Sequence, residues 1–262
     1  MSENPYQAPA AALETAFGNG DRESGELREP RGVAVGRGWG WIREGFGLFK
    51  RQPGLWVLLS MTVVLIQMGL SMVPVVSILN NFFMFLFMAG MYFAAEQTAN
   101  DGDAAFPDLF VGFRENTLRL LKIALVNFFG TLLAVGLSLG LTFGPAMYAE
   151  SGLAQGATDP ALFGPLTILV AMAVFLPVAM ATWFATPLVI LEDVKVLPAL
   201  RMSFMACLRN ILPLFVYGLA LAALFLLGAL PLLLGLLVVV PLMILSSYTA
   251  YRDIFYSGPA PA

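Results

Sequence analysis

The sequence predicts an all-α, polytopic membrane protein: a bundle of six transmembrane helices paired as three hairpins, with interfacial helices on the cytoplasmic side. Of its 262 residues, 59% are hydrophobic and only 12% are charged, whereas an ordinary soluble domain has roughly 25% charged residues. The mean hydropathy is +0.81. Because so few polar residues are available to cover a water-facing surface, lipid must surround most of the chain.

Six apolar stretches reach the roughly 20 helical residues that a bilayer core about 30 Å thick requires. They are residues 55–73, 75–95, 120–143, 165–190, 211–230 and 232–250. Pro74 separates the first two, and residues 228–231 separate the last two. We therefore expect these pairs to be hairpins with almost no exterior loop.

The positive charges indicate which side of the membrane each connection occupies. All 14 Lys and Arg residues lie before the first span, around the second and fourth connections, or after the last span. Basic residues accumulate in short cytoplasmic loops. We therefore expect an inner-membrane protein with both termini in the cytoplasm, divided into a disordered cytoplasmic tail (1–34), a six-span domain (35–256) and a short cytoplasmic C-terminal tail (257–262).

The N-terminal tail contains several Pro and Gly residues and a mixed charge run, a composition that buries too little apolar surface to fold. It has no apolar stretch typical of a signal peptide, so the first span is expected to direct insertion. Its segment Asn4-Pro5-Tyr6-Gln7-Ala8-Pro9 is either a docking motif or, as we favour, plain extended chain.

An interfacial helix is expected just before the first span. Between residues 39 and 51, Trp39, Ile42, Phe46 and Phe49 recur at helical spacing with basic residues between them. Such a helix is either an elbow that leads into the membrane or a lipid-sensing anchor. Similar stretches with Phe and a basic residue precede the third and fifth spans, which indicates either a threefold repeat or a shared requirement for entering the membrane.

The residue inventory excludes several kinds of chemistry. The chain has no histidine, one cysteine (Cys207) and a formal net charge of −3. These numbers exclude imidazole catalysis, a Cys/His metal site, an intramolecular disulfide and a basic surface for nucleic acid. We expect no enzymatic activity, no cofactor and no metal.

Amides are the main polar groups inside the expected spans. They are Gln67, Asn80, Asn81 and Asn127. Amides in lipid form hydrogen bonds between helices, so we interpret them as packing contacts. The alternative is that they line the path of a transported solute.

Other features of the spans indicate packing more than chemistry. Gly136, Gly140 and Gly144 form a face that permits close helix approach. The methionine stripe of span two is interpreted as apolar filling and not as a metal site. We interpret the adjacent Glu192 and Asp193 as a solvated turn, because neighbouring residues do not face each other on a helix.

Several short segments are similar to those of a known family. They are WIREGF at 41–46, FPDLF at 106–110, PLV at 187–189, ALRMS at 199–203 and YTAYRDIF at 248–255. Over residues 35–256 they resemble a family of uncharacterised six-helix bacterial inner-membrane proteins. A looser likeness, to the membrane domain of bacterial glycerophosphodiester phosphodiesterases, points toward lipid. The resemblance implies the six-helix architecture and contributes no catalytic residue.

Together these observations favour a non-enzymatic membrane protein that acts through contacts with membrane lipids or with a partner protein. The alternative is a transporter for a small solute or lipid, with a path past the intramembrane asparagines.

Overall fold

The structure, a computed structural model, describes residues 27–100, 102–150, 160–230 and 234–256, and these residues form helices without a strand. The described part of the chain contains nine α-helices: α2 (Arg37–Arg51), α3 (Pro53–Ser71), α4 (Pro74–Ala99), α5 (Thr117–Glu150), α6 (Pro160–Trp183), α7 (Ala185–Glu192), α8 (Val196–Arg209), α9 (Ile211–Ala229) and α10 (Leu236–Phe255). A short 3₁₀ helix, η1 (Phe106–Phe113), connects α4 to α5. The all-α fold class is confirmed.

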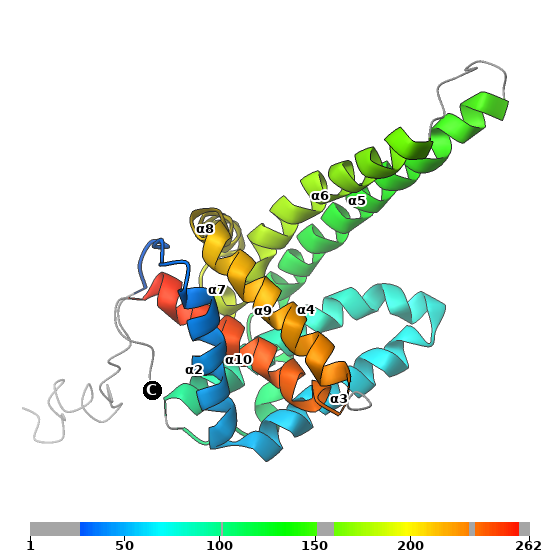
Figure 1. Ribbon diagram of the computed structural model, residues 1–262. Helices are drawn as coiled ribbons and strands as arrows, with labels where there is room; N and C mark the ends of the chain where they lie inside the picture. The colour runs from blue at the N-terminus through cyan, green and yellow to red at the C-terminus, as the bar shows by residue number, and fades with distance from the viewer. Residues whose placement is uncertain (1–26, 101, 151–159, 231–233, 257–262) are drawn as a thin grey trace, which may run out of the picture.

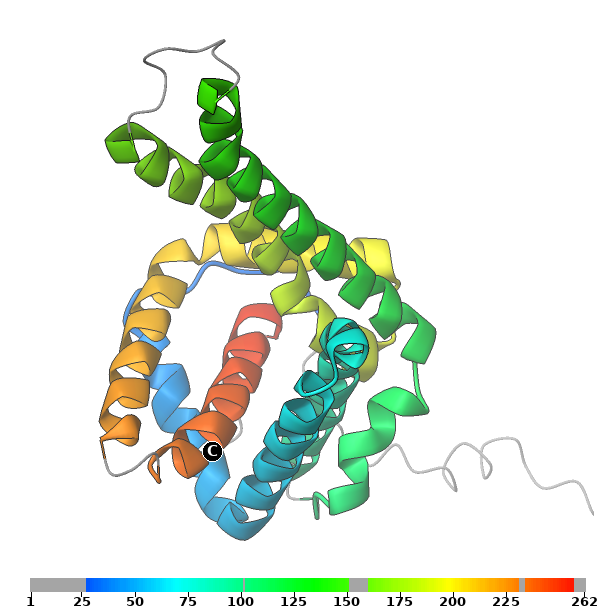
Figure 2. The ribbon, with the colours of Figure 1, turned by 90° about the vertical axis from the view of Figure 1, so that its right-hand side faces the viewer.

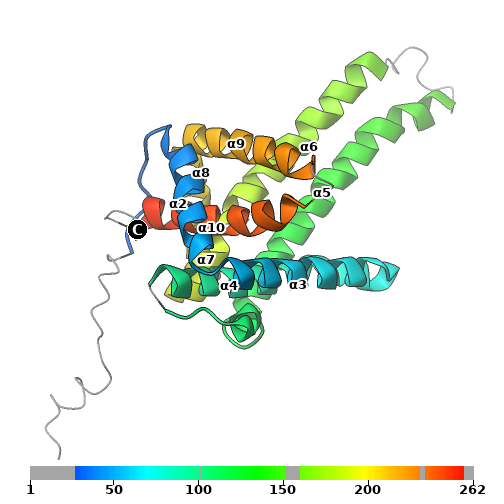
Figure 3. The same ribbon diagram turned by 60° about the horizontal axis from the view of Figure 1, so that its bottom comes forward.

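Long helices pair along the chain, with α3 against α4, α5 against α6 and α9 against α10. Figures 1 and 3 show α2, α7 and α8 gathered at one end of the molecule, from which the long helices extend. The α5–α6 pair diverges from the others toward its far end.

Five helical segments within the described residues are long and apolar enough to cross a membrane. They are Pro53–Ser71, Thr117–Phe143, Gly164–Glu192, Ile211–Ala229 and Leu236–Phe255. These five overlap five of the six expected spans. The 26-residue helix α4 occupies the place of the remaining one and is not in this set, which was drawn from the described residues alone.

Helix α10 forms the core of the bundle. Most of its residues are buried, whereas the other four membrane-length segments are largely exposed. It contacts α2, α3, α4 and α9, and Figure 2 shows it between α9 and α4. The exposed apolar faces of the outer helices are therefore the faces available to lipid.

The interfacial helix α2 lies directly against the bundle because glycine lets two backbones meet. A Cβ atom added at Gly45 would lie 2.7 Å from the backbone nitrogen of Ser246 on α10. Trp41 is fully buried in this contact, while Trp39 is 49% exposed. The expected helix is thus present, and Ile42 and Phe49 of its apolar spacing are buried, but the fully buried tryptophan is Trp41 and not Trp39.

Residues 27–36 pack across the end of α10, which corrects the expected boundary of the disordered tail. The backbone amides of Arg28 and Arg31 donate to the carbonyl oxygens of Phe255 and Ile254. Asn210, which is fully buried, donates to the carbonyl of Arg31 and accepts from the amide of Val33. The prediction of disorder is therefore wrong for residues 27–34. Residues 1–26, including the Asn4–Pro9 segment, and the C-terminal tail 257–262 lie outside the described residues.

One expected span is interrupted between α6 and α7. Pro187 has no amide proton, so it cannot donate the backbone hydrogen bond that would continue the helix. The Ser203 hydroxyl on α8 compensates: it accepts from the amide of Phe184 at 2.9 Å and donates to the carbonyl of Met180 at 2.7 Å. The break is thus stabilised by a neighbouring helix, and the two helices remain one membrane-length segment.

The expected glycine face of α5 makes no close approach within the described chain. No atom lies within 4 Å of a Cβ atom built at Gly136 or Gly140. The close contact between α5 and α6 is made one turn and a half earlier, where Gly130 meets Val178. The surroundings of Gly144 lie outside the described part of the chain.

Candidate functional site

Three of the four intramembrane amides donate a hydrogen bond to a neighbouring helix. Gln67 on α3 donates to the sulfur of Met84 on α4 at 3.1 Å. Asn80 on α4 donates to Ser71 on α3 at 3.2 Å, and Asn127 on α5 donates to Thr182 on α6 at 3.4 Å. Asn81 has no hydrogen-bond partner among the residues that the structure describes.

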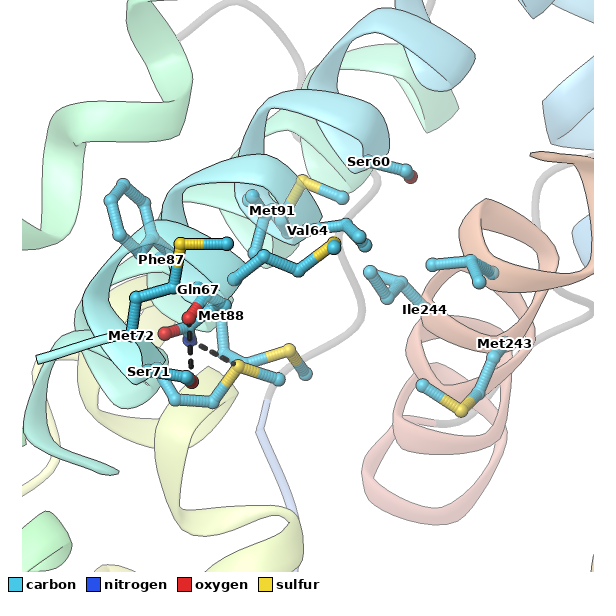
Figure 4. Close-up of a pocket in the computed structure, with 14 residues that line it drawn as sticks. Ser60, Val64, Gln67, Ser71, Met72, Phe87, Met88, Met91, Met243 and Ile244 are labelled. Atoms are coloured by element: carbon cyan, nitrogen blue, oxygen red, sulfur yellow. Dashed lines mark hydrogen bonds between the residues drawn. The ribbon is translucent and has the colours of Figure 1, made fainter. Parts of the chain in front are cut away.

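A cavity of about 510 Å³ lies between α3, α4 and α10. Its volume falls within the range of about 300–1,000 Å³ that is typical of small-molecule sites. Figure 4 shows α3 and α4 residues on one side and Met243 and Ile244 of α10 on the other. Methionine dominates the lining, with Met68, Met72, Met84, Met88, Met91 and Met243.

This first cavity is open along its α3 side. Met68 and Met72 at its mouth are 55% and 78% exposed, whereas Met91 in its interior is 1% exposed. Because the outer face of α3 is apolar, the mouth faces the region that lipid would occupy.

A second cavity, of about 290 Å³, adjoins the first at the root of the α5–α6 pair. The two cavities share four lining residues, Met84, Met88, Met243 and Ile244. We call the two adjoining cavities together the chamber; α3, α4 and α10 line the first, and α4, α5, α6, α7 and α10 line the second.

Uncharged polar groups line the second cavity. The Ser247 hydroxyl accepts from the Trp183 indole at 3.0 Å and shares a hydrogen bond with Tyr92 at 2.8 Å. Thr186 is 3% exposed and lines the cavity, but no described residue hydrogen-bonds its hydroxyl. The amide of Asn127 lies on the same wall. This arrangement can hold an apolar chain and hydrogen-bond an oxygen atom at one end of it.

A charged cluster follows the chamber toward the end of α10. Glu96 on α4 accepts from Tyr248 at 2.7 Å and pairs with Arg252 at 3.5 Å. Glu192 on α7 accepts from Tyr256. The interpretation of a solvated turn is therefore wrong for Glu192, although Asp193 is exposed and pairs with Arg119 at 2.5 Å.

Another carboxylate, that of Asp253, holds the N-terminal segment and α2 against α10. Its side chain accepts from Arg31 at 2.6 Å, from Arg37 at 2.6 Å and from the buried Trp41 indole at 2.8 Å. Sequence reasoning missed this residue because its three partners precede it by more than 200 positions. Its only visible signal was an acidic residue at the end of an apolar stretch.

Cys207 lies on α8 and is 3% exposed, with its sulfur 3.5 Å from the carbonyl oxygen of Met180. Burial raises the pKa of the Cys207 thiol to about 12. Among the described residues, no cluster of three or more His, Cys, Asp or Glu side chains is arranged to hold a metal ion.

A scan of the sequence against models of known protein families finds no match, and no solved structure matches the chain. A protein named probable inner membrane protein, from Burkholderia thailandensis, is 32% identical over 251 aligned residues. The alignment covers 85% of this chain and 92% of the relative. This match and the membrane-length helices show an integral inner-membrane protein, and the likeness to the phosphodiesterase membrane domain stays a prediction. The chain belongs to the same family as this probable inner membrane protein.

Proposed function

We propose that the protein is non-enzymatic and acts through lipid, holding an apolar chain in the methionine-lined chamber. The observation that carries this proposal is that six methionines from three helices line one cavity whose mouth lies on an exposed apolar face. Methionine is unbranched and flexible, so a methionine-rich wall adapts to the shape of an apolar ligand. Membrane lipids are the partners that such a chamber meets first.

The proposed arrangement has six spans, with α4 as the second, and places both termini in the cytoplasm. The pairing of α3 with α4, α5 with α6 and α9 with α10 supports three hairpins. The basic residues of α2 and α8 lie at the end from which these pairs extend, where the charge distribution along the sequence puts the cytoplasm.

The alternative, a path for a transported solute past Asn80, Asn81 and Asn127, receives less support. Asn127 lines the second cavity, and neither Asn80 nor Asn81 lines either of the two cavities described. If Asn127 acts as a packing contact, replacing it by Leu should lower the free energy of unfolding by about 1 kcal/mol, the scale of one interhelical hydrogen bond. A solute path instead requires that this substitution abolish transport without such a loss.

Photo-crosslinking tests the lipid proposal directly. Purified protein in lipid nanodiscs is irradiated with a diazirine-bearing alkyl chain, and labelled residues are identified by mass spectrometry. We expect label on Met91 and Met243 inside the chamber as well as on lipid-facing residues. Met88→Trp should fill the chamber and remove the label from Met243, because Met88 lines both cavities.

Met172 on the outer face of α6 provides the internal control, since it is 56% exposed and lines neither cavity. Its labelling should be the same in the wild type and in Met88→Trp. Label on Met172 without label on Met91 or Met243 would show that chains contact only the outside of the bundle, and the proposal would be wrong.

A further inference from the structure

The two cavities of the chamber differ in the chemistry of their walls. The first is built mainly from methionine and aliphatic side chains, with Ser60, Gln67 and Ser71 as its polar residues, whereas half of the residues that line the second carry hydroxyl, amide or indole groups. Among the described residues that line the two cavities, none is charged. A ligand that fills both must therefore be apolar along most of its length and polar at one end.

The polar end of the chamber has hydrogen-bonding capacity that the chain itself does not use. Thr186 is 3% exposed and its hydroxyl has no partner among the described residues. The hydrogen bond from Asn127 to Thr182 uses only the amide nitrogen, and no described residue donates to the Asn127 side-chain oxygen. Burying such groups against hydrocarbon is unfavourable, so a ligand that supplies oxygen atoms here is favoured over a plain alkane.

The absence of charge from these walls also restricts the head of the ligand. A phosphate or carboxylate in the second cavity would meet no cation, and burying an unpaired charge is costly. Arg252, the nearest base along α10, is 10% exposed and pairs with Glu96 outside both cavities. An anionic head is therefore excluded from this part of the chamber.

Resting on the lipid function proposed above, we propose that the chamber selects a single-chain amphiphile with an uncharged head that carries hydroxyl or ester oxygen atoms. The chain lies among the methionines between α3, α4 and α10. The head lies in the second cavity and bonds to Thr186 and Asn127. A monoacylglycerol is the simplest lipid of this class.

Competition against the photoreactive alkyl chain tests the selection. Three competitors share a C18 chain: monooleoylglycerol, oleoyl lysophosphatidic acid, which adds a phosphate to the same glycerol ester, and 1-octadecene, which has no head. The readout is loss of label from Met243. We expect monooleoylglycerol to compete at a concentration at least about tenfold lower than either of the others, because tenfold corresponds to one or two neutral hydrogen bonds.

Substituting Thr186 tests whether the preference for monooleoylglycerol arises from hydrogen bonds to its head in the second cavity. Thr186→Val should weaken competition by monooleoylglycerol between about two- and tenfold, the scale of one neutral hydrogen bond, and leave 1-octadecene unchanged. Thr186→Ser keeps the hydroxyl and should retain the preference. Thr142→Val, on an exposed residue of α5 away from both cavities, should behave as the wild type.

The outcomes separate this inference from the function on which it rests. Equal competition by all three compounds would leave the apolar chamber in place and overturn the head-group selection. Stronger competition by lysophosphatidic acid, or an unchanged preference in Thr186→Val, would also overturn it. If none of the compounds reduced the label, both the selection and the lipid function would be wrong.

Discussion

Replacing Asp253 by Ala should separate the N-terminal segment and α2 from the core helix. The Asp253 side chain is only 7% exposed, and it accepts from three donors on that segment and helix. The substitution leaves the buried indole of Trp41 without an acceptor. It also removes the Asp253 carboxylate from the guanidinium groups of Arg31 and Arg37, although Arg37 keeps its ion pair with Glu44 at 2.8 Å.

The size of the expected loss in the free energy of unfolding depends on how deeply each donor to Asp253 is buried. A hydrogen bond to a charged group contributes about 1.5–3 kcal/mol, and this full range applies to Trp41, which is 0% exposed. The side chains of Arg31 and Arg37 are 47% and 35% exposed, so solvent screening limits each ion pair to at most about 1 kcal/mol. The expected loss in the free energy of unfolding is therefore about 3 kcal/mol.

Unfolding in mixed micelles with increasing SDS, followed by tryptophan fluorescence, measures this loss. Asp193→Asn is the control, because Asp193 also pairs with an arginine but its side chain is 74% exposed, and asparagine removes the charge while tolerating the φ of 53° at this position. The control should lose less than about 1 kcal/mol. A similar small loss in both variants would refute the reasoning that burial gives Asp253 its importance.

Three further predictions use the same unfolding assay or a labelling assay. Deleting residues 1–26 should leave the free energy of unfolding unchanged. Deleting residues 1–34 should lower it by at least about 2 kcal/mol, because buried Asn210 loses its partners Arg31 and Val33. Equal stability of the two deletion variants would mean that residues 27–34 contribute nothing. Gly45→Ala should cost about 1–3 kcal/mol, since the new Cβ meets the α10 backbone, whereas Gly47→Ala, which meets no atom within 4 Å, should be neutral or stabilising by up to about 1 kcal/mol. Cys207, buried and with its pKa raised to about 12, should react with maleimide at pH 7–9 only after unfolding, and rapid labelling of folded protein would contradict its placement.

The helices themselves could be predicted from sequence because each depends on local information. The apolar run that starts at Ile211 and the Pro53 start of α3 are both visible in a short window of residues. The interfacial helix before α3 was found in the same way from its spacing of aromatic residues. Its buried face was found only in part. Ile42 and Phe49 of that spacing are buried, but only contact with α10 shows that Trp41 and not Trp39 turns inward.

The candidate site could be predicted only in fragments. The stripe of Met84, Met88 and Met91 was visible on one helix, but the chamber also needs Met68 from α3 and Met243 from α10. Nothing local indicates that these distant methionines share a cavity. The polar wall is equally non-local, because Ser247 reaches Tyr92 across 155 positions of the chain.

Intermolecular contacts between lipid and methionine methyl groups test the lipid chamber most directly. In protein labelled with ¹³C at the methionine methyl groups and otherwise deuterated, nuclear Overhauser effects from protonated acyl chains report which methionines touch lipid. Met91, which is 1% exposed, and Met243 should show strong effects from chain methylene protons. Met180, which is partly buried against the core and lines neither cavity, should show weaker effects than Met91. Effects from water and not from acyl chains at Met91 and Met243 would contradict the lipid chamber and favour a solute path.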